Sequence, residues 1–274
     1  IAYEAATADL NDVNMIDPFH LEAYRKVTVN YNRDVEIFPV LDAMFKKIFG
    51  SSPYKSPTDM GVNMAGNCII DDDAVCHAAN LEIIRRYYSA LCEQRESGVA
   101  TDTVSKLELI MKQANLTPEL RPVIGAANKK AEETNAPAAA IELSDGKIVT
   151  GKTSSLLGAS SAAILNALKY LASIDDDVEL ISPSIIEPVQ KLKTCHLGNN
   201  NPRLHTDEAL IALSISAVTY EPASRAMEKI GELKGCEAHS SVILSGVDIN
   251  VFKKLGVNIT CDPKYQMKKL YHKK

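Results

Sequence analysis

"AAAIELSDGKIVTGKTS" (Ala138–Ser154) decides the fold class, because it contains two short β-prone runs joined by a tight turn. The turn falls at Asp145-Gly146, whose residues tolerate the positive φ angles of a type I′ turn. The chain from Asp71 to about Asn135 is typical of helices, and the pattern changes at Ala136. The stretch therefore predicts a β-hairpin at the start of a new domain.

The chain after the hairpin indicates alternating helices and strands. An alanine-rich helix, small on one face for close packing, is predicted over Gly158–Ile174, and a buried strand over Asp177–Pro183. Three helices and a strand–helix–strand unit follow, at residues 183–198, 206–219, 221–235, 237–245, 248–256 and 257–263. The order ββα-βα-αα-βαβ predicts an α/β domain with a mixed sheet.

The chain before the hairpin indicates two further regions. Val27 and Val29 alternate with polar residues as in a short strand, and a helix with one apolar face is predicted to end at Gly50. A turn-rich break with two prolines follows. We predict the end of an α/β domain at residues 1–56, a helical bridge at 57–135 and a C-terminal α/β domain at 136–274. The acidic run Asp71–Asp73 favours a helix start over a cation site.

Composition and charge exclude several classes of protein. The net charge is −5, which disfavours a general nucleic-acid surface, and no apolar run reaches the ~18 residues of a membrane span. The N-terminal residues lack the features of a signal peptide, and the six cysteines form no CxxC pair. We expect a cytoplasmic protein with reduced, mostly buried thiols, and with neither nucleic-acid nor membrane partners. The chain begins at Ile1 without an initiator Met, which indicates a fragment.

The polar run "HLGNNNPRLHTDE" (His196–Glu208) is the first candidate site. Its simplest interpretation is a capped loop, in which Gly198 ends one helix and Thr206 caps the next. The other interpretation is a ligand loop, because its polar residues exceed what a helix connection needs. The catalytic candidates are then His205, His196 and Asp207, and the binding candidates are Arg203, Asn199 and Asn200.

Arg203 and His205 carry the chemistry of this ligand loop. An arginine offers a planar fork for a carboxylate or phosphate, and a histidine moves protons near neutral pH. We expect the nearby arginine to disfavour the cationic form of His205 and leave a neutral base. The alternative is that Arg203 forms only a surface pair with Asp207 or Glu208. No metal site is predicted, since His196 and His205 are nine positions apart and no cysteine pair completes a ligand set.

Two other stretches are candidate ligand sites. Asp59, Asn63 and Asn67 are interleaved with glycines that would let the backbone approach a ligand, although the spacing matches no phosphate-loop motif. Asn32 and Arg33 are expected between a strand and a helix, where α/β proteins often place ligand residues. Arg33 beside Asp34 is equally consistent with an exposed ion pair. Ser154 and Ser155 lack a GxSxG elbow, which disfavours serine catalysis there.

Two families resemble this sequence. The runs "SPYKSPTDMGVNMAGNCI", "IELSDGKIVTGKTSSLLGAS" and "HLGNNNPRLHTDEALIALSISA" closely resemble a bacterial family known as domain of unknown function 1846, over essentially all 274 residues. The resemblance implies a missing N-terminal half with a glycine-rich phosphate loop, so nucleotide binding is expected only through that half. The family implies no substrate and no catalytic residues.

The second resemblance concerns the fold of the C-terminal region alone. The hairpin followed by a small-residue turn and a helix is similar in order to the cytidine-deaminase fold. The zinc and proton-shuttle positions of that fold correspond here to Ala159–Ala162 and Pro183–Ile186, which contain no zinc ligand. The expected fold is therefore a zinc-less, deaminase-like α/β domain.

Two hypotheses of function remain. The first is an enzyme, or an enzyme-like protein, that acts on a small polar or phosphorylated ligand in an inter-domain cleft. The second is a non-catalytic module for oligomerisation or partner binding. A homo-oligomer is expected under either hypothesis.

Overall fold

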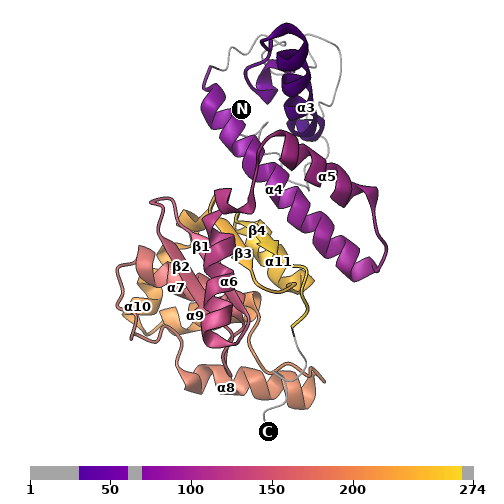
Figure 1. The fold of residues 1–274 in the computed structure, drawn as a ribbon. Helices are drawn as coiled ribbons and strands as arrows, with labels where there is room; N and C mark the ends of the chain where they lie inside the picture. The colour runs from indigo at the N-terminus through magenta and orange to yellow at the C-terminus, as the bar shows by residue number, and fades with distance from the viewer. Residues whose placement is uncertain (1–30, 61–69, 267–274) are drawn as a thin grey trace, which may run out of the picture. The chain divides into compact units, whose positions relative to one another are not determined.

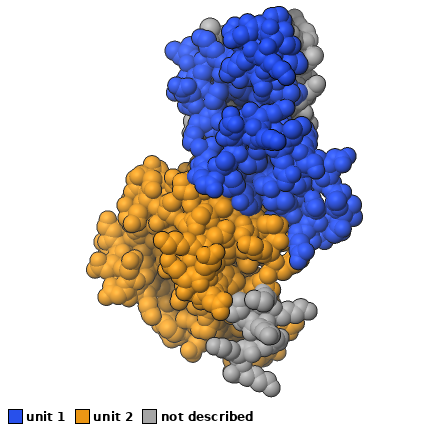
Figure 2. Space-filling model, viewed as in Figure 1, with its two compact units in different colours: residues 1–120 blue, residues 121–274 orange. Residues whose placement is uncertain are grey.

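The computed structural model describes residues 31–60 and 70–266 of the chain (Figure 1). Its internal contacts divide the chain into two compact units, residues 1–120 (unit 1) and 121–274 (unit 2), which are coloured separately in Figure 2. Each unit is described by itself below. The functional division into three domains remains a prediction.

Unit 1 is helical in its described residues. Its helices are α3 (Tyr31–Phe49), α4 (Asp72–Ser97) and α5 (Asp102–Gln113), with short 3-10 turns at Pro57–Met60 and Pro118–Leu120. The side chain of Asp71 accepts a hydrogen bond from the Ala74 N–H at 3.0 Å, which caps α4. This contact supports the helix-start interpretation of the acidic run, and the helical prediction from Asp71 onward is confirmed.

Helix α3 begins earlier than the sequence indicated. Its first residue is Tyr31, so Asn32 and Arg33 lie in its first turn rather than in a loop between a strand and a helix. No glycine or proline interrupts the backbone before Pro39, so the helix continues where a loop was expected. Gly50 ends the helix with a φ of 79°, as predicted. The predicted strand around Val27 lies outside the described residues.

A four-stranded mixed sheet forms the centre of unit 2 (Figure 1), which confirms the predicted α/β class. The strands are β1 (Ala138–Glu142), β2 (Ile148–Lys152), β3 (Glu237–Ser240) and β4 (Asn258–Cys261), in the order β2-β1-β3-β4. β1 is antiparallel to both β2 and β3, whereas β3 and β4 are parallel. β1 therefore lies between its hairpin partner β2 and β3, which is almost a hundred residues later in the chain.

The predicted hairpin is present, but its turn differs from the expected one. The Gly146 N–H donates to the Leu143 carbonyl at 2.9 Å, and the Leu143 N–H donates to the Lys147 carbonyl at 2.9 Å. Among the described residues of this turn, only Gly146 has a positive φ, of 80°. The turn is therefore the longer kind that places one glycine in the left-handed region after an ordinary turn, and a two-residue type I′ turn is wrong.

Helix α7 (Ala159–Leu171) packs directly on β2 because both surfaces are small. A Cβ atom at Gly151 would lie 2.2 Å from the Ala163 backbone nitrogen, so only glycine fits there. Ala163 and Ala167 are fully buried at this contact, which confirms the predicted small helix face. The close approach fixes the N-terminal end of α7 relative to the sheet.

Helix α6 (Pro122–Thr134), which was assigned to the bridge, packs against β1 in unit 2. The helical pattern expected up to about Asn135 is interrupted here, because the chain forms a 3-10 turn at Pro118–Leu120 and starts an α-helix at Pro122. Arg121 has φ −111° and ψ 88°. A residue before proline is disfavoured in the α region, which explains the interruption.

The predicted strand at Asp177–Pro183 is wrong. These residues pair with no strand in the described part of the chain, although Leu180 and Ile181 are buried in the core of unit 2. A short apolar run is buried in a loop as readily as in a strand, so its composition could not separate the two. The resemblance to a zinc-less cytidine-deaminase fold is therefore not supported, since it relied on a strand–helix junction at this place.

The remaining helices of unit 2 follow the predicted order. They are α8 (Pro183–Lys191), which continues into a π-helical turn (Leu192–His196), α9 (Thr206–Ala217), α10 (Glu221–Glu228), a 3-10 turn (Ile230–Leu233) and α11 (Gly246–Lys254). Gly198 has a φ of 69° and ends the α8 segment as predicted.

Candidate functional site

The second half of the polar run is held against the loop that precedes α7. The Leu204 N–H donates to the Leu156 carbonyl at 3.0 Å, and the Leu204 carbonyl accepts from the Gly158 N–H at 3.2 Å. The Ser161 hydroxyl donates to the same carbonyl at 2.9 Å. Leu204 itself is fully buried. These bonds place the two residues beside Leu204, which are Arg203 and His205, at the N-terminal end of α7.

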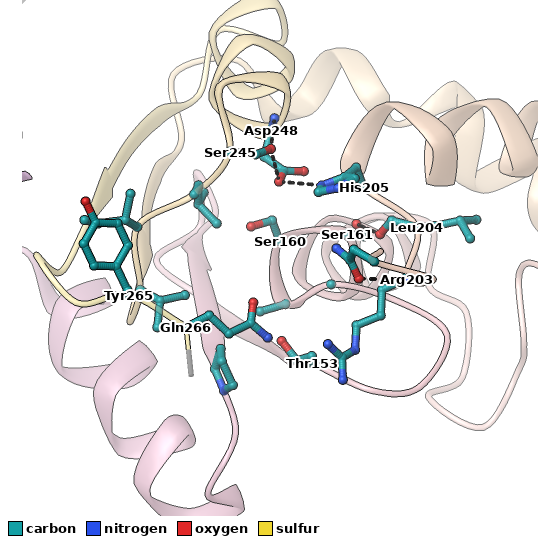
Figure 3. A pocket seen from close by; sticks show the side chains of 17 residues that line it. Thr153, Ser160, Ser161, Arg203, Leu204, His205, Ser245, Asp248, Tyr265 and Gln266 are labelled. Atoms are coloured by element: carbon teal, nitrogen blue, oxygen red, sulfur yellow. Dashed lines mark hydrogen bonds and ion pairs between the residues drawn. The ribbon is translucent and has the colours of Figure 1, made fainter. Parts of the chain in front are cut away.

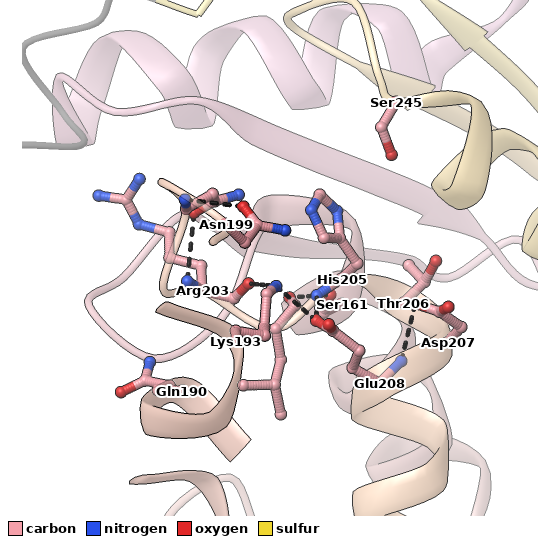
Figure 4. Close-up of polar contacts among 12 residues, drawn as sticks. Ser161, Gln190, Lys193, Asn199, Arg203, His205, Thr206, Asp207, Glu208 and Ser245 are labelled. Carbon is pink, nitrogen blue, oxygen red and sulfur yellow. Dashed lines mark hydrogen bonds and ion pairs between the residues drawn. The ribbon is translucent and has the colours of Figure 1, made fainter. Parts of the chain in front are cut away.

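Lys193 anchors the same segment from the opposite side (Figure 4). Its Nζ donates to the Arg203 carbonyl at 2.7 Å and pairs with Glu208 at 2.7 Å, although the lysine is only 3% exposed. Glu208 also accepts from the His205 N–H at 2.8 Å, which satisfies the backbone donor of the residue that precedes α9. His205 is thus the N-cap of this helix, and the predicted cap at Thr206 is displaced by one position.

A pocket with a volume of ≈ 210 Å³ lies within unit 2, where the N-terminal ends of three helices meet. It is lined by Gly158 and the first three residues of α7, by Asn201 and Arg203–His205 before α9, and by Ser245 and Asp248 at the start of α11. Val242–Leu244 and Tyr265 supply apolar surface. The volume is below the about 300–1,000 Å³ of pockets for drug-sized ligands, so the space suits a smaller molecule.

His205 and Asp248 form an ion pair on the wall of this pocket (Figure 3). His205 Nδ1 lies 3.0 Å from Asp248 Oδ2, and the same carboxylate accepts from the Ser245 hydroxyl at 2.7 Å. The other oxygen, Oδ1, accepts from the Thr206 N–H and hydroxyl, both at 2.9 Å. Asp248 therefore has its oxygens occupied, which fixes both its position and that of the imidazole.

The electrostatics of this pair reverse one expectation from the sequence. The hydrogen bond that the His205 ring donates to the Asp248 carboxylate raises the pKa of His205, and burial and Lys193 oppose this effect less strongly. Burial opposes ionisation of Asp248, but the bonds from His205, Thr206 and Ser245 outweigh it and lower its pKa to about 2. The expectation that Arg203 lowers the pKa of His205 is therefore wrong in direction, because the Asp248 carboxylate, 43 residues away in the sequence, has the larger effect.

Arg203 and Ser160 complete the polar wall of the pocket. The Arg203 Nε donates to the Ser154 carbonyl at 2.6 Å, which holds the guanidinium at the pocket. The Ser160 side chain is only 3% exposed, and its hydroxyl has no hydrogen-bond partner among the described residues. Figure 3 shows it pointing into the pocket, toward the space that His205 and Gln266 also face.

The structure separates the predicted site residues into groups. Arg203 and His205 line the pocket together. His196, Asn199 and Asn200 lie in an exposed stretch, and Asp207 accepts from the Glu208 N–H at 2.8 Å. The polar run is thus half solvent-exposed loop and half pocket wall.

The candidates of the other two stretches lie in unit 1 or outside the described residues. Asp59 accepts from the Lys55 N–H at 2.7 Å, in the manner of a turn. Asn32 and Arg33 belong to the first turn of α3. Asn63 and Asn67 fall outside the described residues. These assignments, and the inter-domain cleft, remain predictions.

Three residues of the pocket region were missed by the sequence analysis, namely Ser160, Lys193 and Asp248. Asp248 carries a usable signal, because Ser245 and Asp248 have the spacing of a helix-capping box. Ser160 and Lys193 carry no local signal, since one lies among small helix residues and the other among exposed ones. Among the described residues, no group of three or more His, Cys, Asp or Glu side chains is arranged to hold a metal ion.

Comparisons with known proteins place the whole chain in one family. A family model described as "Domain of unknown function DUF1846, N-terminal" matches residues 1–115, and one described as "Domain of unknown function DUF1846, C-terminal" matches residues 119–271. A UPF0371 protein of Streptococcus thermophilus is 57% identical over 273 residues, which are 100% of this chain and 55% of the relative. A UPF0371 protein of Streptococcus pyogenes serotype M5 is 56% identical over the same shares.

The chain spans about half the length of these relatives, since their matched share is 55%. No helix in the described part of the chain is long and apolar enough to cross a membrane.

Proposed function

We propose that this chain, which belongs to the DUF1846 family, binds a small polar metabolite in the pocket of unit 2 and transfers a proton to or from it through His205. The observation that carries the proposal is the His205–Asp248 pair at 3.0 Å, which opens on the same pocket as the Arg203 guanidinium. A histidine oriented by a buried carboxylate is a recurrent arrangement for general acid–base catalysis. An arginine beside it supplies bidentate binding for a carboxylate or phosphate group of the ligand.

The two ring nitrogens of His205 have different roles in this proposal. Nδ1 faces Asp248, which holds the ring and stabilises its protonated form. Nε2 makes no hydrogen bond with the described residues and is the nitrogen that would exchange a proton with the ligand. Because the pKa of His205 is raised, the ring is suited to donate a proton as a general acid near neutral pH.

A ligand screen tests this proposal. The protein is heated with a panel of small phosphorylated and carboxylated metabolites, and a ligand at 100 times its Kd should stabilise it by about 2.7 kcal/mol. Each ligand that shifts the melting temperature is then followed by NMR for turnover or for deuterium exchange at its carbon positions.

Matched histidine variants decide whether His205 moves the proton. His205→Gln should abolish turnover while leaving a melting-temperature shift by the ligand, and His77→Gln, at an exposed position of α4, should change neither. Turnover that survives in His205→Gln would refute proton transfer by this residue.

A second function, that of a partner-binding or oligomerisation module, is favoured by one observation on α9. Ile211, Ile215 and the following Val218 are 60%, 55% and 82% exposed, and their spacing places them on one side of the helix. Light scattering after size exclusion tests this candidate. Ile215→Lys should lower the oligomeric mass if this surface joins two copies, and a monomeric wild-type protein would rule that out.

A further inference from the structure

We propose that the N-terminal end of α7, together with the Ser160 hydroxyl, forms a binding subsite for the phosphate group of a small phosphomonoester. The inference uses the pocket of the proposed function and names the class of ligand, but it does not depend on proton transfer by His205. Its basis is an uncapped helix terminus with a buried, unpartnered hydroxyl aimed into the same space (Figure 3).

Helix α7 presents free backbone donors to the pocket. Its N-cap is Gly158, which has no side chain to accept a bond from the first turn, and no acidic residue lies in that turn. The first intrahelical bond is from the Ala162 N–H to the Gly158 carbonyl at 3.0 Å, so the N–H groups of residues 159–161 precede it. Residues 158–161 all line the pocket. Such a terminus attracts anions through its donors and its positive dipole end.

The N-terminal end of α7 differs from those of the neighbouring helices, because its first turn contains no acidic residue. α9 carries Asp207 and Glu208 in its first turn, and α11 carries Asp248 in its first turn with a Ser245 side-chain cap. The protein's own carboxylates therefore balance the positive ends of both α9 and α11. The end of α7 has no such group, although it faces the same pocket.

Ser160 supplies the independent observation. Its side chain is 3% exposed, and its hydroxyl lacks a partner among the described residues, whereas the adjacent Ser161 hydroxyl donates to Leu204 at 2.9 Å. A buried hydroxyl without a partner is unfavourable, so a ligand that accepts its hydrogen bond would remove that cost. The position of the hydroxyl, one residue inside the helix, matches an oxygen of an anion held by the first-turn N–H groups.

The charge of the pocket also favours a phosphate. Arg203 and His205 line it as cations when His205 is protonated, and the carboxylate of Asp248 is already bonded to His205, Thr206 and Ser245. Donors approach from α7, from Arg203 and from His205, which suits a tetrahedral anion better than a planar carboxylate with two oxygens. The volume of ≈ 210 Å³ suits a small molecule that carries a single such group.

Titration with inorganic phosphate, followed by calorimetry, tests the subsite directly. We expect saturable binding by the wild-type protein, at least tenfold weaker binding by Ser160→Ala, and weaker binding of acetate than of phosphate. Ser160→Ala should fold with an unchanged or higher Tm, because it removes an unsatisfied hydroxyl. The matched control is Ser216→Ala, at a buried serine on α9 that donates to the Ala212 carbonyl at 3.0 Å, which should keep phosphate affinity.

A substitution at the helix cap gives a second, independent test. Gly158→Asp would add an intramolecular carboxylate to the terminus, and the nearest neighbour of its Cβ would be the Leu204 carbonyl at an ordinary 3.6 Å. We expect this variant to have a higher Tm and to lose phosphate binding, because its own carboxylate occupies the donors. Gly158→Ala, without a carboxylate, should retain binding within a fewfold.

Several outcomes would overturn the subsite. They are no phosphate binding by the wild-type protein, equal binding by Ser160→Ala, and unchanged binding by Gly158→Asp. Equal affinity for dimethyl phosphate, a diester, would overturn the assignment to a monoester. Phosphate binding that needs Ser160, without any turnover that needs His205, would keep the subsite and reject proton transfer. Turnover that needs His205, with phosphate binding indifferent to Ser160, would do the reverse.

Discussion

The Nδ1 atom of His205 lies 3.0 Å from Oδ2 of Asp248, across 43 residues of sequence, and this contact joins the start of α9 to the start of α11. Both residues also line the pocket, so the contact that packs two helices together also sets the charge of the site. Changes to this ion pair should therefore alter both the stability of the protein and the protonation of His205.

The pH dependence of His205 follows from its raised pKa. A histidine with a folded-state pKa above its ordinary 6.5 contributes stability that is fully present below pH 6.5 and is lost as the pH rises through the folded value. We therefore expect wild-type protein to exceed His205→Gln in unfolding free energy by more at about pH 5.5 than at about pH 9. Denaturant unfolding at both values measures this, and a difference that grows with pH would contradict it.

The carboxylate of Asp248 should matter at neutral pH and lose its effect in acid. Its pKa is lowered from 3.8 to about 2, so the stability it contributes is present above 3.8 and is lost as the pH falls through about 2. Asp248→Asn should cost about 1.5–3 kcal/mol at neutral pH, since bonds to a charged acceptor are weakened. NMR titration of the His205 ring should show a lower pKa in this variant. Asp176→Asn, at an exposed acid, serves as the control.

Lys193 should behave as a positioning residue despite its charge. Lys193→Met keeps the buried stem but removes the bonds to the Arg203 carbonyl and to Glu208, so we expect a loss of about 1–3 kcal/mol. The exposed pair Lys229–Glu232 gives a matched control, and Lys229→Met should change stability by less than about 0.5 kcal/mol. Thermal unfolding compares the two, and equal effects would show that burial of Lys193 has no special role.

The contact between Gly151 and Ala163 predicts a sharp difference between two glycines. Gly151→Ala would place its Cβ 2.2 Å from a backbone nitrogen, so the strand and helix must separate at a cost of about 3 kcal/mol or more. Gly125→Ala, in the exposed part of α6 with nothing within 4 Å, should stabilise by about 0.5–1 kcal/mol. Denaturant midpoints measure both, and a tolerated Gly151→Ala would contradict the close approach.

Arg203→Lys separates ligand binding from folding. Lysine keeps the charge but cannot reproduce the planar fork, so phosphate affinity should fall by about tenfold or more, the scale of one charged hydrogen bond. The lost bond from Nε to the Ser154 carbonyl should cost only about 0.5–1.5 kcal/mol of stability. The same calorimetric titration checks the first effect. Unchanged phosphate affinity would show that the Arg203 guanidinium does not bind the phosphate.

Local sequence signals predicted most elements of unit 2, and their limits are physical. The hairpin follows from Asp145-Gly146 between β-prone runs, and the small face of α7 follows from its alanines, because both depend on neighbouring residues. The strand expected at Asp177–Pro183 is absent because Leu180 and Ile181 are buried in a loop, and a short apolar run has the same composition in a buried loop as in a buried strand. Arg203 and His205 could be predicted as site residues because their segment contains more polar residues than a connection between two helices requires.

The partners of these two residues could not be found in this way. Asp248 is 43 residues from His205 along the chain, and Ser160 belongs to another helix. Their meeting depends on how the helices dock on the sheet, which no spacing in the sequence records. The same reason explains why the pKa direction expected for His205 is wrong, since Arg203 is near in the sequence and Asp248 is not.

The place of β1 in the sheet has a consequence for the order of folding. β1 pairs with β2 through a five-residue connection, whereas its other neighbour, β3, begins at Glu237. Closing the short loop loses less chain entropy than closing the long one, so the hairpin and α7 should assemble early and the β3–α11–β4 segment should dock late. Asp248 belongs to the late segment and Ser160 to the early one. The pocket should therefore form only at the last folding step, so that a chain stalled in synthesis before Gly246 contains Arg203, His205 and Ser160 but lacks the Asp248 carboxylate that holds His205.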